Sequence, residues 1–368
     1  MSAWLKRLAA LLTTATLMAC ASATTSPGPS QPGGDVGLTS EQLLAELSGK
    51  SEEEREQHLL GLAQEAGTIS LYADAQLDDS AELLDAFSEA YDLEISIYDG
   101  STDSVRDRLL QEAAAGYRGA DVVELDALGM YVVSEADLLA AVETPYAAAV
   151  GPAGRFDDWT AIRYSFLVTA WNTGAVSAGS EPTEFRELAD AAWSGRLGLE
   201  SSDVYWFAAI VKHYQATEGM TEDQAVDVFR SIAANSQVID GHTATSDFLV
   251  AGQFDVSPNV YAHRILQLQE DGAPVEWQPA VQPVVAEPTG IALLKSARNP
   301  AGALLYIDWV LSADGGQQIF VDQQRIPSHV EVAATVVGDV QPIEAAFNEI
   351  AAEYDKWSTL WDEIVRGS

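Results

Sequence analysis

The chain has 368 residues, 47% of them hydrophobic, and its 56 acidic residues against 19 basic residues give a net charge of −37. This length permits one large domain or two ordinary ones, with ample apolar material for their cores. Because so acidic a surface repels phosphate backbones and anionic headgroups, the composition disfavours nucleic-acid binding, and any membrane contact must come from something other than basic residues.

Residues 1–19 have the form of an export signal. Lys6 and Arg7 precede an apolar run that is too short and too interrupted for a transmembrane anchor. The sequence Leu-Met-Ala-Cys at 17–20 resembles the lipobox of bacterial lipoproteins, which implies that Cys20 becomes the lipid-modified first residue of the mature protein. The alternative is an ordinary cleaved signal with an incidental cysteine. Since Cys20 is the only cysteine, the chain has no internal disulfide framework.

Residues 20–38 are rich in Ser, Thr, Pro and Gly, a composition that predicts a flexible tether. Together, the signal and the tether predict a protein on the extracytoplasmic side of a bacterial membrane, either in the periplasm or on the outer face of the cell membrane. The lipid on Cys20 would be its link to that membrane.

Strand and helix patterns alternate along the first half of the chain. Capping-box patterns start helices at Thr39 and Ser51, and another at Asp79 is expected to start the helix of the stretch 67–87, which reads as strand, polar loop and helix. The elements predicted next are a strand over 93–98, a helix after 100–102, a strand over 120–125 and a helix through 142.

The pattern resets after the apolar segment 164–171, which reads as a buried strand. The elements predicted after it are helices over 185–193 and 204–214, a strand over 196–200, a helix capped at 221–224, strands over 254–257 and 290–294, a helix opening at 259–263, and helices over 300–311, 314–321 and 341–364. Short strands that alternate with helices indicate an α/β fold with mainly parallel sheets. The reset near Trp171 and a return near Trp277 predict two lobes joined by more than one crossing.

Motifs that signal catalysis or nucleotide binding are absent from the sequence: it has no phosphate-binding glycine loop, no G-x-S-x-G and no H-E-x-x-H. A lone cysteine and five scattered histidines disfavour a zinc-type cluster. These features predict a protein that is not an enzyme and carries no cofactor.

Polar residues gather at the predicted strand ends, where open α/β sheets bind small ligands. The candidate ligand-binding residues are Asp74, Gln76, Ser101, Thr102, Asp126, Ser201, Ser202, Asn259 and Tyr261. Taken singly, each Ser, Thr or Asn is more simply a helix cap, Asp126 is equally well a solvated loop acid, and Tyr261 fits ordinary core packing. Their joint placement is what favours a shared cleft.

The ordered segments of the chain resemble a known family. They include GTISLYAD, the GST loop, GADVVELDA, AWNTGAV, GRLGLESSDVYWF, GQFDVSPNVYAH and PTGIALLKSARNPAGALLYIDWV, and the likeness runs from about Gly67 to Val332. The chain is similar to the extracellular solute-binding proteins of ABC importers, in particular the two-lobed type that includes ferric-ion-binding proteins. This resemblance implies an α/β, two-lobed periplasmic-binding-protein-like fold of type II, in which each lobe is a mainly parallel sheet flanked by helices and a ligand cleft lies between the lobes.

The resemblance also implies a division of the chain into lobes. Lobe 1 would comprise residues 39–163 and a returning segment 277–331, and lobe 2 residues 164–276. The C-terminal helix, within 332–368, is expected on lobe 2. The implied partners are a small-molecule or metal solute and the ABC permease, and the protein is expected to be a monomer.

Ferric-binding members of the family hold iron with a carboxylate, usually a histidine, and two adjacent tyrosines. By position these fall on Asp126, near Gln76, and on Val260 and Tyr261, so the resemblance implies Asp126 and Tyr261 as the remaining metal ligands. Fe(III) would be a transported ligand and not a cofactor. An organic or anionic solute held by helix N-termini at 101–102 and 201–202 is the competing specificity.

The predicted function is therefore a lipid-anchored receptor that captures a small solute between two hinged lobes and presents it to an ABC permease. One alternative is a secreted hydrolase that uses Asp126 with another cleft acid. Another is a lipoprotein scaffold whose cleft is filled by its own side chains.

Overall fold

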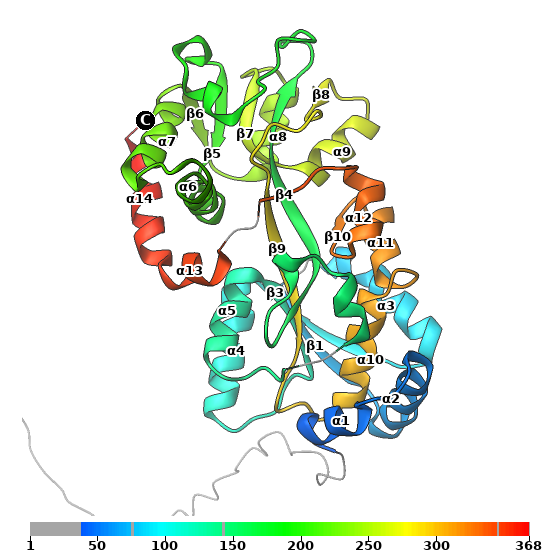
Figure 1. The fold of residues 1–368 in the computed structure, drawn as a ribbon. Helices are drawn as coiled ribbons and strands as arrows, with labels where there is room; N and C mark the ends of the chain where they lie inside the picture. The colour runs from blue at the N-terminus through cyan, green and yellow to red at the C-terminus, as the bar shows by residue number, and fades with distance from the viewer. Residues whose placement is uncertain (1–37, 75–76, 142–143, 344–345, 368) are drawn as a thin grey trace, which may run out of the picture. The chain divides into compact units, whose positions relative to one another are not determined.

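A computed structural model describes residues 38–74, 77–141, 144–343 and 346–367. The segment Gly37–Ser368 forms one compact unit. Its strands belong to a single sheet with the order β2-β1-β3-β9-β4-β7-β5-β6, to which β8 and β10 are added beside β4. Figure 1 shows β4 and β9 running along the middle, with parallel strands and helices at both ends.

One end of the sheet is parallel. Its strands are β1 (Ile69–Ala73), β2 (Ile95–Asp99) and β3 (Val122–Asp126). They are followed in the chain by α3 (Leu77–Tyr91), α4 (Thr102–Ala114) and α5 (Ala127–Glu135). Because each strand runs directly into a helix, the carboxyl ends of β1 and β3 and the amino ends of α4 and α5 lie at the same edge.

The other end repeats this construction. Its strands are β5 (Leu197–Glu200), β6 (Ser236–Ile239) and β7 (Val256–Tyr261), with β5 parallel to both neighbours. The helices of this part are α6 (Val204–Glu218), α7 (Glu222–Ala234), α8 (His242–Val250) and α9 (Ala262–Glu270).

Two long antiparallel strands join the ends. They are β4 (Thr160–Asn172) and β9 (Val285–Leu293), which pair with each other, while β9 also pairs with β3 and β4 also pairs with β7. The short strands β8 (Val275–Glu276) and β10 (Ile326–Pro327) pair with β4. The strand predicted over 290–294 is thus longer than its apolar pattern indicated and extends back through Pro288.

The remaining helices cover the two ends of the sheet. They are α1 (Ser40–Leu47), α2 (Glu52–Ala66), α10 (Pro300–Leu311), α11 (Gly316–Asp322), α12 (Val330–Val337), α13 (Phe347–Ala352) and α14 (Tyr354–Arg366), with 3-10 turns η1 (Pro145–Ala149), η2 (Pro152–Gly154), η3 (Phe185–Ala189) and η4 (Ala191–Trp193). Buried Trp357 and Trp361 of α14 pack in one core cluster with Trp206 of α6. The C-terminal helices therefore cover the α6 side of the molecule (Figure 1).

Local signals placed several helix starts correctly. Thr39, Ser51 and Thr221 each cap a helix through a reciprocal capping box. The start expected at Asp79 is wrong, because α3 already begins at Leu77. The helix expected through 142 ends at Glu135, since Asp137 adopts a left-handed backbone with φ 59°.

Other parts of the chain also differ from the prediction. The helix expected over 341–364 is divided into α13 and α14, with Glu353 between them. Strand β6 was not predicted, because its residues are exposed or half-buried and carry no apolar run. Pairing with β5 makes it a strand.

Candidate functional site

Two carboxylates meet at the strand ends of the first parallel part. The Oγ1 atom of Thr102 lies 2.7 Å from Asp74 Oδ2 and 2.7 Å from Asp126 Oδ2, and the backbone N–H of Asp126 donates to Asp74 Oδ2 at 2.7 Å. A threonine hydroxyl has a single proton to donate. The hydroxyl therefore has one proton to offer to two carboxylates. We call Asp74, Thr102 and Asp126 the lobe-1 group.

Burial raises the pKa of two acids in this part of the molecule. Burial raises the pKa of Asp74, the hydrogen bonds from the Asp126 N–H and the Thr102 hydroxyl oppose this rise, and the charge of Asp126 adds to it. On the same strand as Asp126, burial raises the pKa of Glu124 to about 7, although Arg163 lies 3.7 Å away and acts in the opposite direction. A positive ligand would favour the ionised form of these acids.

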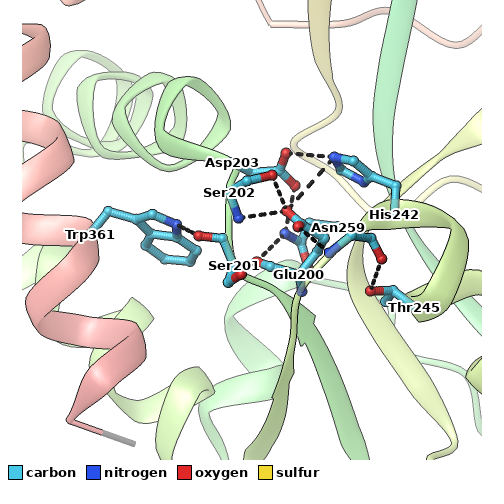
Figure 2. Close-up of polar contacts among 9 residues, drawn as sticks. Glu200, Ser201, Ser202, Asp203, His242, Thr245, Asn259 and Trp361 are labelled. Carbon is cyan, nitrogen blue, oxygen red and sulfur yellow. Dashed lines mark hydrogen bonds and ion pairs between the residues drawn. The ribbon is translucent and has the colours of Figure 1, made fainter.

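Two acids and a histidine gather near the end of β5, and Figure 2 shows their contacts. The set consists of Glu200, Asp203 and His242, which we call the lobe-2 group. The Nε2 atom of His242 lies 3.0 Å from Asp203 Oδ1 and 3.7 Å from Glu200 Oε2. One nitrogen or oxygen of each residue lies within 4.8 Å of the others, a separation at which a metal ion can be held.

The chain positions this group through the starts of two helices. Asp203 is the residue before α6 and His242 is the first residue of α8. Glu200 is fully buried and its carboxylate accepts from the backbone N–H of Gly241 at 3.0 Å and of Ser202 at 2.7 Å, and from the Ser202 hydroxyl at 2.8 Å.

Asn259 locks the group in place from strand β7. Its side-chain amide donates to the backbone oxygen of Glu200 at 3.0 Å and to Asp203 Oδ2 at 2.6 Å, and its oxygen accepts from the backbone N–H of Glu200 at 3.0 Å. Since Asn259 is completely buried, these bonds are shielded from water. Asn259 therefore orients acids and, in this structure, does not point a free amide at a ligand.

In the lobe-2 group, burial and ion pairing have opposite effects on the pKa values of Asp203 and His242. Burial raises the pKa of Asp203, while its contact with His242 lowers it. Burial alone would lower the pKa of His242, but the hydrogen bond and charge of Asp203, together with the charges of Glu200 and Glu287, produce a net rise. The Nδ1 atom of His242 is buried and has no hydrogen-bond partner among the described residues.

Glu287 connects the two groups. On β9, Thr289 pairs with Asp126 of β3, and Glu287, two residues away on the same face, pairs with Ser165 of β4. The pKa of Glu287 is raised to about 8, mainly by burial and also by the charges of Asp126, Asp203 and Asp74, while the charge of His242 opposes the rise. Acids of both the lobe-1 group and the lobe-2 group therefore raise the pKa of Glu287.

Tyr261 lies at the end of β7 within an aromatic stack. Its ring centroid is 3.9 Å from that of His242 and 5.2 Å from that of His263. Burial raises the pKa of Tyr261, and the charges of Glu287, Asp203, Glu200 and Asp126 add to the rise. The neighbouring Val260 is fully buried in a different apolar cluster.

The other predicted site residues have local roles. Ser101 caps α4 by accepting from the Ser104 N–H at 3.3 Å. The carbonyl of Ser201 accepts from Trp361 Nε1 at 2.7 Å, and the Ser202 hydroxyl is bonded to Glu200. Gln76 and Cys20 lie outside the described residues.

Sequence reasoning missed four residues of this site: Glu200, Asp203, His242 and Glu287. Glu200 and Asp203 flank the predicted residues Ser201 and Ser202, and His242 follows strand β6, which was not predicted. An acid directly before a helix start was the signal that could have identified Asp203. No local signal distinguishes Glu287, because only the pairing of β9 with β3 and β4 brings it near the others. The metal assignment to Asp126 and Tyr261 stays a prediction.

No helix in the described part of the chain combines the length and apolar character needed to span a membrane. A family model for bacterial extracellular solute-binding proteins matches residues 82–345. No curated protein sequence matches the chain significantly.

Solved structures share the fold. The IdiA/FutA protein of Trichodesmium, in complex with iron and citrate, matches with a TM-score of 0.68 and 20% identity over 81% of this chain and 99% of its own. Iron-bound HitA of Pseudomonas aeruginosa matches with a TM-score of 0.65 and 18% identity over 81% and 99%. Ferric iron-binding protein A of Mannheimia haemolytica, in an open conformation, matches with a TM-score of 0.68 and 18% identity over 81% and 98%.

The fold and the matched family define a two-lobed solute-binding protein of the ABC-importer type, so the predicted fold class and the resemblance are confirmed. The chain belongs to the bacterial extracellular solute-binding protein family. Membership implies an extracytoplasmic location, a small solute or metal ion as ligand and a permease as partner. Its family and its fold neighbours are binding proteins and not enzymes.

Proposed function

We propose that this chain is the substrate-binding lipoprotein of an ABC importer and that it captures a small cation between its two lobes. The observation that carries the proposal is the convergence of acids at Glu287. Three carboxylates raise the pKa of Glu287: Asp74 directly after β1, Asp126 at the end of β3 and Asp203 before α6. A site that holds so much mutually repelling negative charge favours a positively charged guest.

This charge disfavours the anionic solute that the helix starts at 101–102 and 201–202 suggested. The Thr102 hydroxyl already contacts two carboxylates, and the Ser202 hydroxyl and N–H are bonded to Glu200. An anion at either position would meet carboxylate oxygens within a few ångströms. A cation would be attracted by the same oxygens.

Iron is one cation of this class. The Trichodesmium and Pseudomonas proteins contain it, and Asp126 and Tyr261 supply a carboxylate and a phenol. Fe(III) prefers hard oxygen ligands, and Val260 supplies none where the resemblance implies a second tyrosine. An iron complex would therefore have to bring some of its own ligands.

The proposed mechanics are hinged closure without chemistry. Lobe 1 would comprise 39–163 with 277–331, and lobe 2 would comprise 164–276 with the C-terminal helices. Strand β4 supports a hinge near 164–171, because it pairs with β9 over 160–167 and with β7 over 167–171. The second hinge would be the segment 277–283, which leads into β9. The monomer would be anchored through lipid on Cys20.

The test begins with native mass spectrometry of protein purified without chelators, which identifies the solute that co-purifies. Calorimetric titration of that solute then compares Asp126→Asn with the wild type. Asparagine retains the helix cap to Gly129 but removes the charge, and we expect affinity to fall about 30-fold or more. The matched control is Asp227→Asn, whose side chain is 68% exposed on α7 and whose affinity should match the wild type. An anionic solute bound equally by Asp126→Asn would refute the proposal.

A further inference from the structure

We propose that Glu200, Asp203 and His242 bind one divalent transition-metal ion. This inference rests on the proposed function and names the class of cation that the site captures. It differs from the position implied by the family resemblance, which is Asp126 and Tyr261.

The first support is the spacing of the ligand atoms. A first-row metal binds imidazole nitrogen and carboxylate oxygen at about 2.0–2.2 Å, so neighbouring ligand atoms lie about 2.8–3.6 Å apart in octahedral or tetrahedral geometry. His242 Nε2 lies 3.0 Å from Asp203 Oδ1 and 3.7 Å from Glu200 Oε2. Both distances to His242 therefore lie within about 0.1 Å of this range, and the oxygen atoms of the two carboxylates lie within 4.8 Å of each other.

The second support is the chemistry of the donors. One imidazole with two carboxylates is a borderline set that suits Mn²⁺, Fe²⁺, Co²⁺ or Zn²⁺. Calcium and magnesium prefer oxygen ligands alone, and Ca²⁺ takes six to eight of them. Fe(III) would be better served by phenolate, and Tyr261 lies against His242 through its ring face, with the centroids 3.9 Å apart.

The third support is the outer shell that holds the ligands. Glu200 is fixed by the N–H groups of Gly241 and Ser202, and Asp203 is fixed by the Asn259 amide at 2.6 Å. Bonds of this kind orient metal ligands, and their loss typically costs about 10–100-fold in metal affinity. The group is thus positioned before an ion arrives, at the starts of α6 and α8 (Figure 2).

The test uses Co²⁺ as the probe on the full chain freed of metal by chelator. Binding is followed by the visible absorption of Co²⁺ and by calorimetry, with Zn²⁺ as competitor. We expect one Co²⁺ per chain, displaced by Zn²⁺. His242→Gln should lower Co²⁺ affinity at least about 100-fold, because a direct ligand matters more than its outer shell. Asp203→Asn, which keeps the shape of the side chain and an acceptor for Asn259, should do the same.

The matched control is His58→Gln. His58 also lies beside a carboxylate, with Nε2 3.3 Å from Glu46, but this pair is on exposed helix surface. Its removal should leave Co²⁺ binding unchanged. Thermal unfolding of each variant shows whether lost binding reflects lost folding, and two folded variants that bind Co²⁺ as the wild type does would overturn the inference.

Two further outcomes separate this inference from the proposed function. If Asp126→Asn loses more Co²⁺ affinity than His242→Gln, the ion sits in the lobe-1 group and the inference fails while cation capture stands. If His242→Gln and Asp203→Asn abolish Co²⁺ binding but cells lacking the protein take up metal normally, the site stands and the import function fails.

Discussion

Replacing Glu287 with glutamine should change stability and binding in opposite directions. Burial and the neighbouring acids raise the pKa of this carboxyl from its usual 4.5 to about 8. At pH 7 the cost of holding it in the folded protein is then at most about 3 kcal/mol, at about 1.4 kcal/mol per pKa unit. Because Glu287 keeps partial contact with solvent, water screens part of this cost, and we expect Glu287→Gln to stabilise the empty protein by about 1–2 kcal/mol.

The pH dependence follows from proton linkage. A carboxyl group whose pKa is raised by folding binds more protons in the folded state than in the unfolded state between pH 4.5 and 8. Its contribution to stability is therefore fully present below pH 4.5 and is lost as pH rises toward 8. The glutamine variant lacks this loss, so its advantage should be near zero at pH 4 and largest at pH 8.

Calorimetric melting at pH 4, 6 and 8 measures the effect. For a folded unit of about 330 residues, 1 kcal/mol corresponds to about 1.4 °C, so the gain should be about 1–3 °C at pH 7 and larger at pH 8. Cation affinity at pH 8 should fall about tenfold or more, because one attracting charge is gone. A variant that is less stable than the wild type at pH 8, or that binds the cation more tightly, would contradict the electrostatic account of Glu287.

Other predictions concern three separate parts of the molecule. Tyr261→Phe keeps the ring between His242 and His263, so it should weaken cation binding in a calorimetric titration while melting stays within about 1 °C; equal affinity would remove the phenol from the site. Asp308→Ala leaves Arg55 buried without its partner at 2.5 Å and should destabilise the protein by about 3–5 kcal/mol in denaturant unfolding, whereas a loss below 1 kcal/mol would mean that the pair contributes little. Cys20→Ser should move the protein from the membrane fraction to the soluble fraction of cells, and continued membrane retention would exclude lipid anchoring.

Local signals predicted much of the fold because they depend on neighbours in sequence. The capping boxes at Thr39, Ser51 and Thr221 are read within four residues, and the structure contains all three. The polar residues at strand ends were found for the same reason, since a strand that passes into a helix is a local pattern. Asp74, Thr102 and Asp126 come from different units of this kind and meet in the structure.

The sequence alone determined the α/β class, the two-lobed family and the edge of the sheet where polar groups gather, because periodicity and strand-helix junctions carry that information along the chain. Only the tertiary structure decided which acids act together. Glu287 lies on a strand whose pairing with β3 and β4 joins residues more than a hundred positions apart, and His242 follows a strand that becomes one only through pairing with β5. The negative charge of the proposed site depends on these long-range contacts. This charge is the basis for proposing a cation as the solute, whereas the local sequence patterns did not distinguish a cation from an anion.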